Sequence, residues 1–297
     1  MKNSTFPSNS SSADCRFYFH TELFTGICLA ILSPITITSN ALLLFTIFKD
    51  PLKCFRAPAT YFIVALASVD LGTGLIVEPF STAPRVKRYV NWSFTLDEPY
   101  NTLEQIGSNL SYVGLNSSFL FVLGLILVQF IAIAYPHHYR SVVTTRRVLA
   151  CVGFSLMYFT VFHVLLFVNV SQKIIELVDL YLHSTLITVF LVVGFAMLLT
   201  AYRQHAIASR RLGVGSSFSG RTGKSLTNEM NERKFTIVTL LVSGILILCI
   251  LPNLVTVHVW LYTKRDDQPD CSDLTSVVFL TNLILYVKVS LDAFIFA

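Results

Sequence analysis

Seven long apolar runs, separated by short polar segments, constrain the fold of this chain more than any other feature of its sequence. A helix rises about 1.5 Å per residue, so about 20 apolar residues cross the ~30 Å hydrocarbon core of a bilayer. None of the runs alternates apolar and polar residues as a membrane strand would. We therefore predict an all-α integral membrane protein, a seven-transmembrane helix bundle. The predicted spans are residues 24–48, 58–80, 104–134, 147–169, 178–202, 235–261 and 274–297.

Composition excludes the main alternative, a soluble enzyme. Hydrophobic residues make up 54% of the 297 residues and charged residues only 13%, whereas about 25% of the residues of a soluble domain are charged. The sequence has no Gly-rich phosphate loop, no nucleophile elbow and no metal-ligand spacing. His163 and His183 are expected to be packed helix residues. We expect no enzymatic activity, no metal and no cofactor.

Lys and Arg are distributed unequally between the loops, which predicts the orientation of the chain in the membrane. Cations such as Arg210 and Arg211 cluster after the first, third and fifth runs, while the other side carries more acids than cations. Because cytoplasmic loops are enriched in Lys and Arg, we predict an extracellular N-terminus. Residues 203–231, rich in Ser, Gly and Arg, then form a flexible third intracellular loop. The net charge of +5 is a difference between two membrane faces and indicates no nucleic-acid partner.

Residues 1–23 are predicted to form an extracellular tail, and residues 24–297 the membrane domain. The first 14 residues are rich in Ser and Asn and lack the apolar core of a signal peptide. Glycosylation acceptor patterns occur in the predicted outer segments, although such patterns also arise by chance. The predicted acceptors are Asn3, Asn9, Asn91 and Asn169.

Only two of the six cysteines, Cys15 and Cys271, lie in segments predicted to be extracellular. Disulfides persist in such oxidising compartments. Cys15 precedes the first span and Cys271 the last, and these two helices are neighbours in a seven-helix ring. We predict a Cys15–Cys271 disulfide, and the alternative is a pair of free thiols.

Short motifs occur in a fixed order along nearly the whole chain. They are Ser39-Asn40, Leu66-Ala67 with Asp70-Leu71, Trp92 with Phe94, Ala134-Tyr135-Pro136, Cys249 with Pro252, and Asp292. Their order and spacing resemble those of the rhodopsin-like (class A) G-protein-coupled receptors. The resemblance implies a multi-pass receptor of the plasma membrane that binds an extracellular ligand and signals through a heterotrimeric G protein.

The inner end of the third span departs from the family pattern. Where the family has Asp-Arg-Tyr, this chain has Val128-Gln129-Phe130. In the family that Arg pairs with a helix-six acid at rest, whereas neutral Gln129 cannot form an ion pair with Glu232. This leaves open a signalling-deficient pseudo-receptor or binding partner of the same fold. The positions expected to face the G protein are Gln129, Tyr202 and Glu232.

Ionisable residues inside the predicted spans indicate a buried polar core. A charge at mid-bilayer costs about 2.5–3.5 kcal/mol and needs a partner, and Lys288 and Asp292 lie four residues apart on one helix face. In the family, polar groups of helices two, three and seven hold a sodium ion. We hypothesise that the Lys288 ammonium replaces that ion between Asp70 and Asp292, and the alternative is a static buried pair. The predicted core is Asn40, Asp70, Ser118, Lys288, Ser290 and Asp292.

The resemblance implies a ligand pocket on the outer side, between helices two, three, six and seven. Ser111 matches the helix-three position where amine receptors carry an Asp, so a typical monoamine ligand is disfavoured. Glu78 and Glu104 would suit a cationic group on a ligand such as a peptide, or they pair with nearby arginines such as Arg88. The residues predicted to bind the ligand are Glu78, Ser111, Tyr112, His258, Asn282 and Tyr286.

Two other functions are less favoured. A transporter or channel is expected to have an internal repeat, with helices interrupted by Gly or Pro at matching positions of the two halves. The sequence has neither feature. An opsin carries its retinal-binding Lys six residues before the Asn of the last-helix motif, where this chain has Tyr286. Lys288 lies two residues further on, which is about 200° around a helix and faces away from a retinal pocket.

Overall fold

The computed structural model describes residues 15–49, 58–164, 172–213, 223–263 and 272–296. Every regular element within these ranges is helical, and η1 and η3 are π-helical turns inside longer helices. The elements are α2 (Arg16–Lys49), α3 (Thr60–Gly72), η1 (Thr73–Val77), α4 (Glu78–Asn91), α5 (Tyr100–Ala134), α6 (Pro136–Val142), α7 (Thr145–Val164), α8 (Gln172–Val178), η3 (Asp179–Leu186), α9 (Ile187–Gly213), α10 (Gly223–Thr263) and α11 (Asp273–Phe296).

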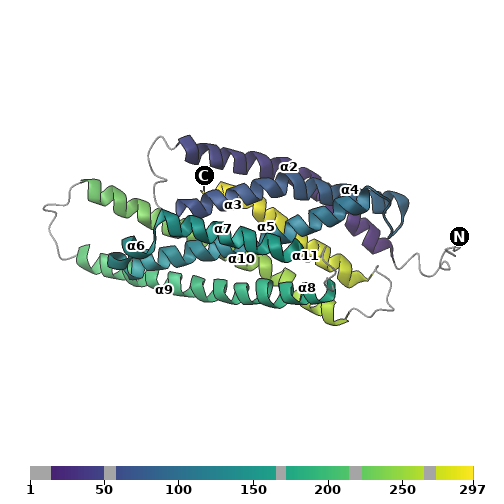
Figure 1. Ribbon diagram of the computed structural model, residues 1–297. Coiled ribbons are helices and arrows are strands. Elements are labelled where there is room, and N and C mark those ends of the chain that lie inside the picture. The colour runs from purple at the N-terminus through teal and green to yellow at the C-terminus, as the bar shows by residue number, and fades with distance from the viewer. Residues whose placement is uncertain (1–14, 50–57, 165–171, 214–222, 264–271, 297) are drawn as a thin grey trace, which may run out of the picture.

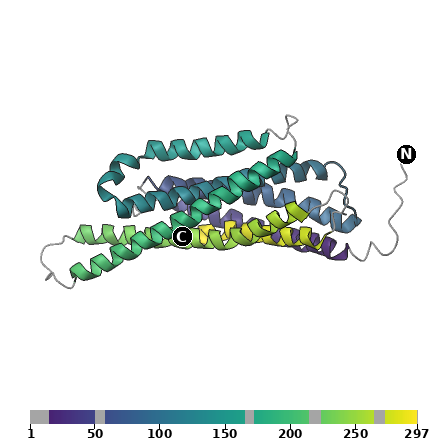
Figure 2. The ribbon, with the colours of Figure 1, turned by 90° about the horizontal axis from the view of Figure 1, so that it is seen from below.

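Seven helical segments among the described residues are long and apolar enough to cross a membrane, which confirms the predicted count and fold class. Figure 1 shows these segments side by side in one elongated bundle, and Figure 2 shows the helix formed by α8, η3 and α9 crossing it obliquely. The spanning segments are Arg16–Lys49, Thr60–Asn91, Tyr100–Ala134, Thr145–Val164, Ile174–Ala208, Arg233–Thr263 and Asp273–Phe296.

The structure corrects several predicted boundaries. Helix α2 begins at Arg16, inside the segment predicted to be a tail, and α9 and α10 extend into the predicted loop 203–231, of which 214–222 lies outside the described residues. The physical reason is that helices continue past the apolar run with polar ends, which hydropathy does not register. Most of the described spanning helices are therefore at least as long as their apolar runs, whereas α7 is described only to Val164.

The second span shows the largest boundary error, because it continues to Asn91 instead of ending at residue 80. A proline has no N–H to donate inside a helix, and the π-helical turn η1 lies just before Pro79. The helix passes this point and resumes as α4. Gly74 in the turn lets α2 approach closely, since a Cβ there would lie 3.0 Å from Thr36.

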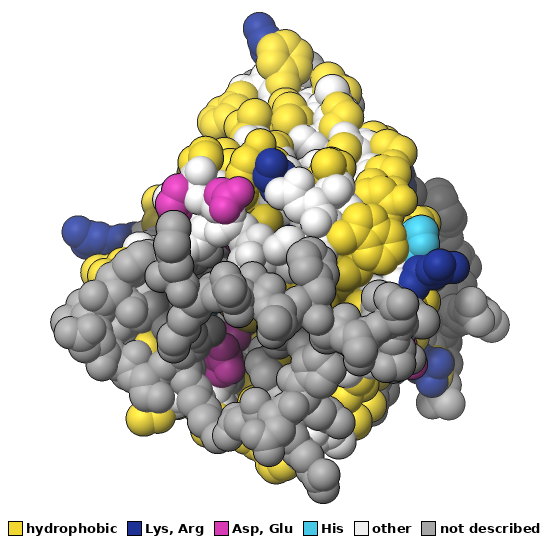
Figure 3. Space-filling view, turned by 90° about the vertical axis from the view of Figure 1, so that its right-hand side faces the viewer, with side chains coloured by type: hydrophobic (Ala, Val, Ile, Leu, Met, Phe, Trp, Pro, Cys, Tyr) yellow, Lys and Arg dark blue, Asp and Glu magenta, His cyan; other side chains and the backbone are white. Residues whose placement is uncertain are grey.

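Helix α5 lies at the centre of the bundle and contacts α3, α4, α7, α9 and α10. Its residues Val122, Leu125 and Ile126 are fully buried in the apolar core together with Leu191 and Leu246. Large apolar side chains are exposed all along the outside of the helices. Figure 3 views the end at which the N-terminus lies and shows hydrophobic side chains over much of the described surface. An apolar exterior around an apolar core is expected where lipid is the solvent.

Candidate functional site

A cavity of about 260 Å³ lies between α5, α7, α8, η3, α10 and α11. It is near the end of the bundle at which α5 and α11 begin and α10 ends. Its polar lining includes Tyr112, Asn116, His163, Glu176, Asp179 and Asn282. Among the described residues that line it, two are acidic and none is Lys or Arg.

Asp179, at the start of η3, is held by two donors, one from α5 and one from η3 itself. Its Oδ1 accepts hydrogen bonds from Asn116 Nδ2 at 2.7 Å and from His183 Nδ1 at 3.0 Å. The other His183 nitrogen, Nε2, lies 3.0 Å from the Tyr158 hydroxyl. A neutral His183 ring that donates from Nδ1 and accepts at Nε2 satisfies both contacts, and we assign it on that basis. The carboxylate is thus fixed in place by Asn116 of α5 and His183 of its own helix.

His163 lines the same cavity from α7 and has no hydrogen-bond partner at either ring nitrogen. The side chain is only 4% exposed and stacks on Tyr112, with ring centroids 5.3 Å apart and planes 9° from parallel. Its Nε2 lies 3.8 Å from Asp179 Oδ1, which is too far for a direct hydrogen bond. An unpaired buried polar atom costs free energy, so a group that bonds a His163 ring nitrogen would recover that cost.

The structure brings two of the six predicted ligand-binding residues to the cavity, Tyr112 and Asn282. Ser111 and Tyr286 instead share a hydrogen bond of 2.7 Å with each other. His258 contacts the Leu254 carbonyl at 2.7 Å through Nδ1 and Thr185 at 3.4 Å through Nε2. The cavity is therefore bordered by helices three to seven, and not by the second helix.

Glu78, which was predicted to bind the ligand, does not line the cavity, and the second span continues well past it to Asn91. Its side chain is completely buried and accepts a hydrogen bond of 3.1 Å from Thr36. The same Thr36 hydroxyl lies 2.6 Å from Ser290 Oγ, and the Thr36 carbonyl accepts a bond from Asn40. Thr36, which the sequence did not single out, thus joins Glu78 to two residues of the predicted polar core.

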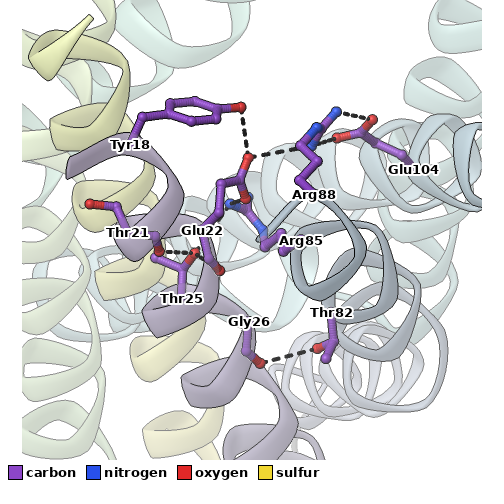
Figure 4. Close-up of polar contacts among 9 residues, drawn as sticks. All are labelled: Tyr18, Thr21, Glu22, Thr25, Gly26, Thr82, Arg85, Arg88 and Glu104. Atoms are coloured by element: carbon purple, nitrogen blue, oxygen red, sulfur yellow. Dashed lines mark hydrogen bonds and ion pairs between the residues drawn. The ribbon is translucent and has the colours of Figure 1, made fainter. Parts of the chain in front are cut away.

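The start of α2, the C-terminal part of α4 and the start of α5 are joined by five residues that we call the Glu22 cluster: Tyr18, Glu22, Arg85, Arg88 and Glu104 (Figure 4). Glu22 Oε2 accepts from Arg85 at 2.9 Å, and Oε1 accepts from Tyr18 at 2.9 Å and Arg88 at 3.3 Å. Arg88 also donates two bonds of 2.6 Å to Glu104. Glu104 therefore pairs with an arginine, the alternative that the sequence left open.

In the predicted polar core, Lys288 and Asp292 form an ion pair one helical turn apart on α11. Each side chain is only 2% exposed. Asp70 interacts electrostatically with both residues and accepts a long hydrogen bond of 3.5 Å from Ser118. The structure thus brings together the three ionisable residues that the sequence grouped.

Of the residues predicted to face the G protein, Gln129 is buried near the C-terminal end of α5. The Tyr202 hydroxyl accepts a hydrogen bond of 3.2 Å from Arg233 Nε, which joins α9 to α10. The Glu232 side chain lies outside the described part of the chain.

Cys15 is disulfide-bonded, whereas Cys28, Cys151 and Cys249 are free thiols. Cys271 lies outside the described residues, so its pairing with Cys15 stays a prediction. Peptide mapping of the purified protein without reduction is expected to recover one peptide pair joined through these two cysteines and released by a reductant. Recovery of Cys271 as an unlinked thiol, or of Cys15 joined to Cys54, would contradict the pairing.

The other predicted modification sites stay predictions. Asn91 is exposed at the end of α4, while Asn3, Asn9 and Asn169 lie outside the described residues. Within the described ranges, no group of three or more His, Cys, Asp or Glu side chains is placed to hold a metal ion.

Sequence reasoning missed Asn116 and Asp179 as members of the site. The available signal was their polarity, since both lie within or beside apolar spans where an unpaired polar group is expensive. Asn116 also begins an Asn-Ser-Ser glycosylation pattern, which is incidental because it lies inside the predicted third span. Its burial and its bond to Asp179 identify it as a structural partner of the cavity acid.

Comparison with known families gives one match over most of the chain. A family model described as 7 transmembrane receptor (rhodopsin family) matches residues 39–296. No curated protein sequence matches the chain. The matched range includes the cavity, the Lys288–Asp292 pair and Gln129.

Proposed function

This chain belongs to the rhodopsin family of seven-transmembrane receptors, and on that premise we propose that it binds an extracellular ligand and signals through a heterotrimeric G protein. The observation that carries the proposal is the cavity with its anchored carboxylate, because ligand sites are concave, largely apolar and provided with a few fixed polar groups. Receptors of this family are generally not enzymes, and we propose no catalytic activity or cofactor.

We also propose that the N-terminus is extracellular and that the chain lies in the plasma membrane. The excess of Lys and Arg in the loops after the first, third and fifth spans supports this orientation. The cavity lies near the end of the bundle that carries the N-terminus, so in this orientation it faces the outside.

Gln129 supports a second candidate, a receptor fold that binds ligand without activating a G protein. The position that bears a charged Arg in the family is neutral here. The contact that this Arg makes with the G protein is therefore missing, and signalling would depend on other inner-side residues. The two candidates differ in one measurable property, nucleotide exchange on Gα.

We expect membranes that contain the wild-type chain to raise nucleotide exchange on at least one class of Gα severalfold above membranes without it. The physical reason is that neutral Gln129 cannot form the ion pair that holds helices three and six together at rest. Gln129→Ala serves as the matched control, since it removes the side chain without adding charge, and it should keep this exchange. Background exchange with wild type, combined with exchange in Gln129→Arg, would instead establish the non-signalling candidate.

A further inference from the structure

We propose that the cavity recognises an organic cation, through a protonated amine of the ligand that binds between Asp179 and His163. This inference rests on the proposed function, because it takes the cavity to be the ligand site. It concerns the charge and shape of the ligand and makes no statement about signalling.

The first argument is the charge of the cavity. Asp179 and Glu176 line it, and no Lys or Arg does so among the described residues. A carboxylate offers about four lone-pair sites, and Asn116 and His183 fill two of those on Asp179. Both bonds fall on Oδ1, so Oδ2 keeps its accepting capacity, and a buried carboxylate strongly favours a cation beside it.

The second argument is the distance between Asp179 and His163. Their nearest atoms, Oδ1 and Nε2, are 3.8 Å apart. Because Oδ1 already accepts two bonds, a ligand ammonium would donate to Oδ2 of the same carboxylate at about 2.8 Å, the length of charge-assisted bonds, and use another of its three donors for His163. The ligand would then supply the hydrogen bond that the neutral His163 ring lacks.

The third argument is the apolar and aromatic remainder of the lining. Tyr112 stacks on His163 beside the carboxylate, and Phe119 and Trp260 also line the cavity. Aromatic faces attract cations and pack against flat apolar groups. The chemistry therefore fits a protonated amine attached to an apolar or aromatic group, either a small amine or the amino group of a peptide.

The acids that line this cavity, Glu176 and Asp179, come from α8 and η3, and not from the third helix. Ser111 of the third helix bonds Tyr286 and does not line the cavity. The sequence disfavoured a monoamine because of Ser111 alone, and the carboxylate supplied by Asp179 removes that reason.

The test measures the thermal unfolding midpoint of the purified full chain in detergent against increasing concentrations of matched probes. One arm compares 2-phenylethylamine with 2-phenylethanol, and the other compares the peptide Phe-Gly-Gly amide with its N-acetylated form. Binding to the folded state raises the midpoint, so at least one amine should raise it while its neutral counterpart does not. The arm that responds identifies the source of the amine.

Asp179→Asn keeps the size of the side chain and removes its charge, so the apparent affinity for the amine should fall roughly tenfold to a hundredfold. Asp273→Asn, which removes an exposed acid outside the cavity, should leave it unchanged. If Asp179→Asn does not fold, His163→Phe keeps the stack on Tyr112 but removes the acceptor, and severalfold weaker binding is expected.

The proposal is overturned if neither amine raises the midpoint above its neutral counterpart, or if the variants bind the amine as wild type does. Nucleotide exchange on Gα, measured with the same probes, separates this proposal from the proposed function. Amine binding without exchange contradicts signalling alone, while exchange without any effect of Asp179→Asn contradicts the amine site alone.

Discussion

Replacing Glu22 by Gln is expected to lower the free energy of unfolding by about 3–5 kcal/mol, the cost of breaking a buried ion pair from one side. Glu22 is fully buried and accepts hydrogen bonds from Arg85, Arg88 and Tyr18. The neutral amide leaves Arg85 without a carboxylate and puts an NH₂ donor where a second oxygen accepts. Because the cluster joins α2 to α4 and α5 (Figure 4), the loss should also loosen the packing of the first helix.

Glu104→Gln is the matched control for this prediction, because it removes the other carboxylate of the same cluster. Its side chain is 36% exposed, so water replaces much of the lost interaction and the expected cost is about 1 kcal/mol or less. Both variants are compared with wild type by thermal unfolding in detergent. Equal unfolding midpoints for the two variants would contradict the prediction. They would show that the buried Glu22 carboxylate contributes no more to stability than the partly exposed Glu104 carboxylate.

Lys288→Met should have an effect of similar size, about 3–5 kcal/mol, since it leaves two buried carboxylates without their cation. Lys288 pairs with Asp292, and Asp70 interacts electrostatically with both. Asp292→Asn removes a negative charge from the same cluster and leaves Lys288 balanced by Asp70. We therefore expect the Lys288 variant to be clearly the less stable of the two, again by the thermal midpoint.

The comparison also tests whether the Lys288 ammonium stands in for a sodium ion. In that case sodium should raise the midpoint of Lys288→Met relative to the same concentration of choline, because the vacated space between Asp70 and Asp292 is then anionic. Wild type should respond equally to the two salts. A sodium-specific stabilisation of wild type would show that Lys288 does not occupy the cation position.

Local patterns predicted more of the polar core than of the cavity. Lys288 and Asp292 are one helical turn apart, so their pairing follows from helix geometry alone. Asp179, in contrast, accepts hydrogen bonds from Asn116 on α5 and from His183 one turn along its own helix. His163 on α7 lies 3.8 Å from the same carboxylate oxygen. The contacts to α5 and α7 depend on how three helices pack, and no spacing in the sequence encodes that packing.

Glu78 illustrates how one helix end changes the interpretation of a residue. The apolar run ends at residue 80, so Glu78 was predicted at the mouth of the pocket. The helix continues to Asn91, which buries the carboxylate beside Thr36. Arg85 and Arg88, which lie on the part of this helix beyond residue 80, instead form ion pairs with Glu22 of the first helix.

The sequence by itself determined the fold class, the seven spans and the family, because a bilayer admits few architectures and each requires a long apolar run. It also placed Asp70, Lys288 and Asp292 in the interior, where charge must be paired. Only the tertiary structure decided which acids are neutralised by arginine, as Glu22 and Glu104 are, and which acids line a cavity, as Glu176 and Asp179 do. That distinction depends on side chains that meet across helices, at distances set by packing and not by position along the chain.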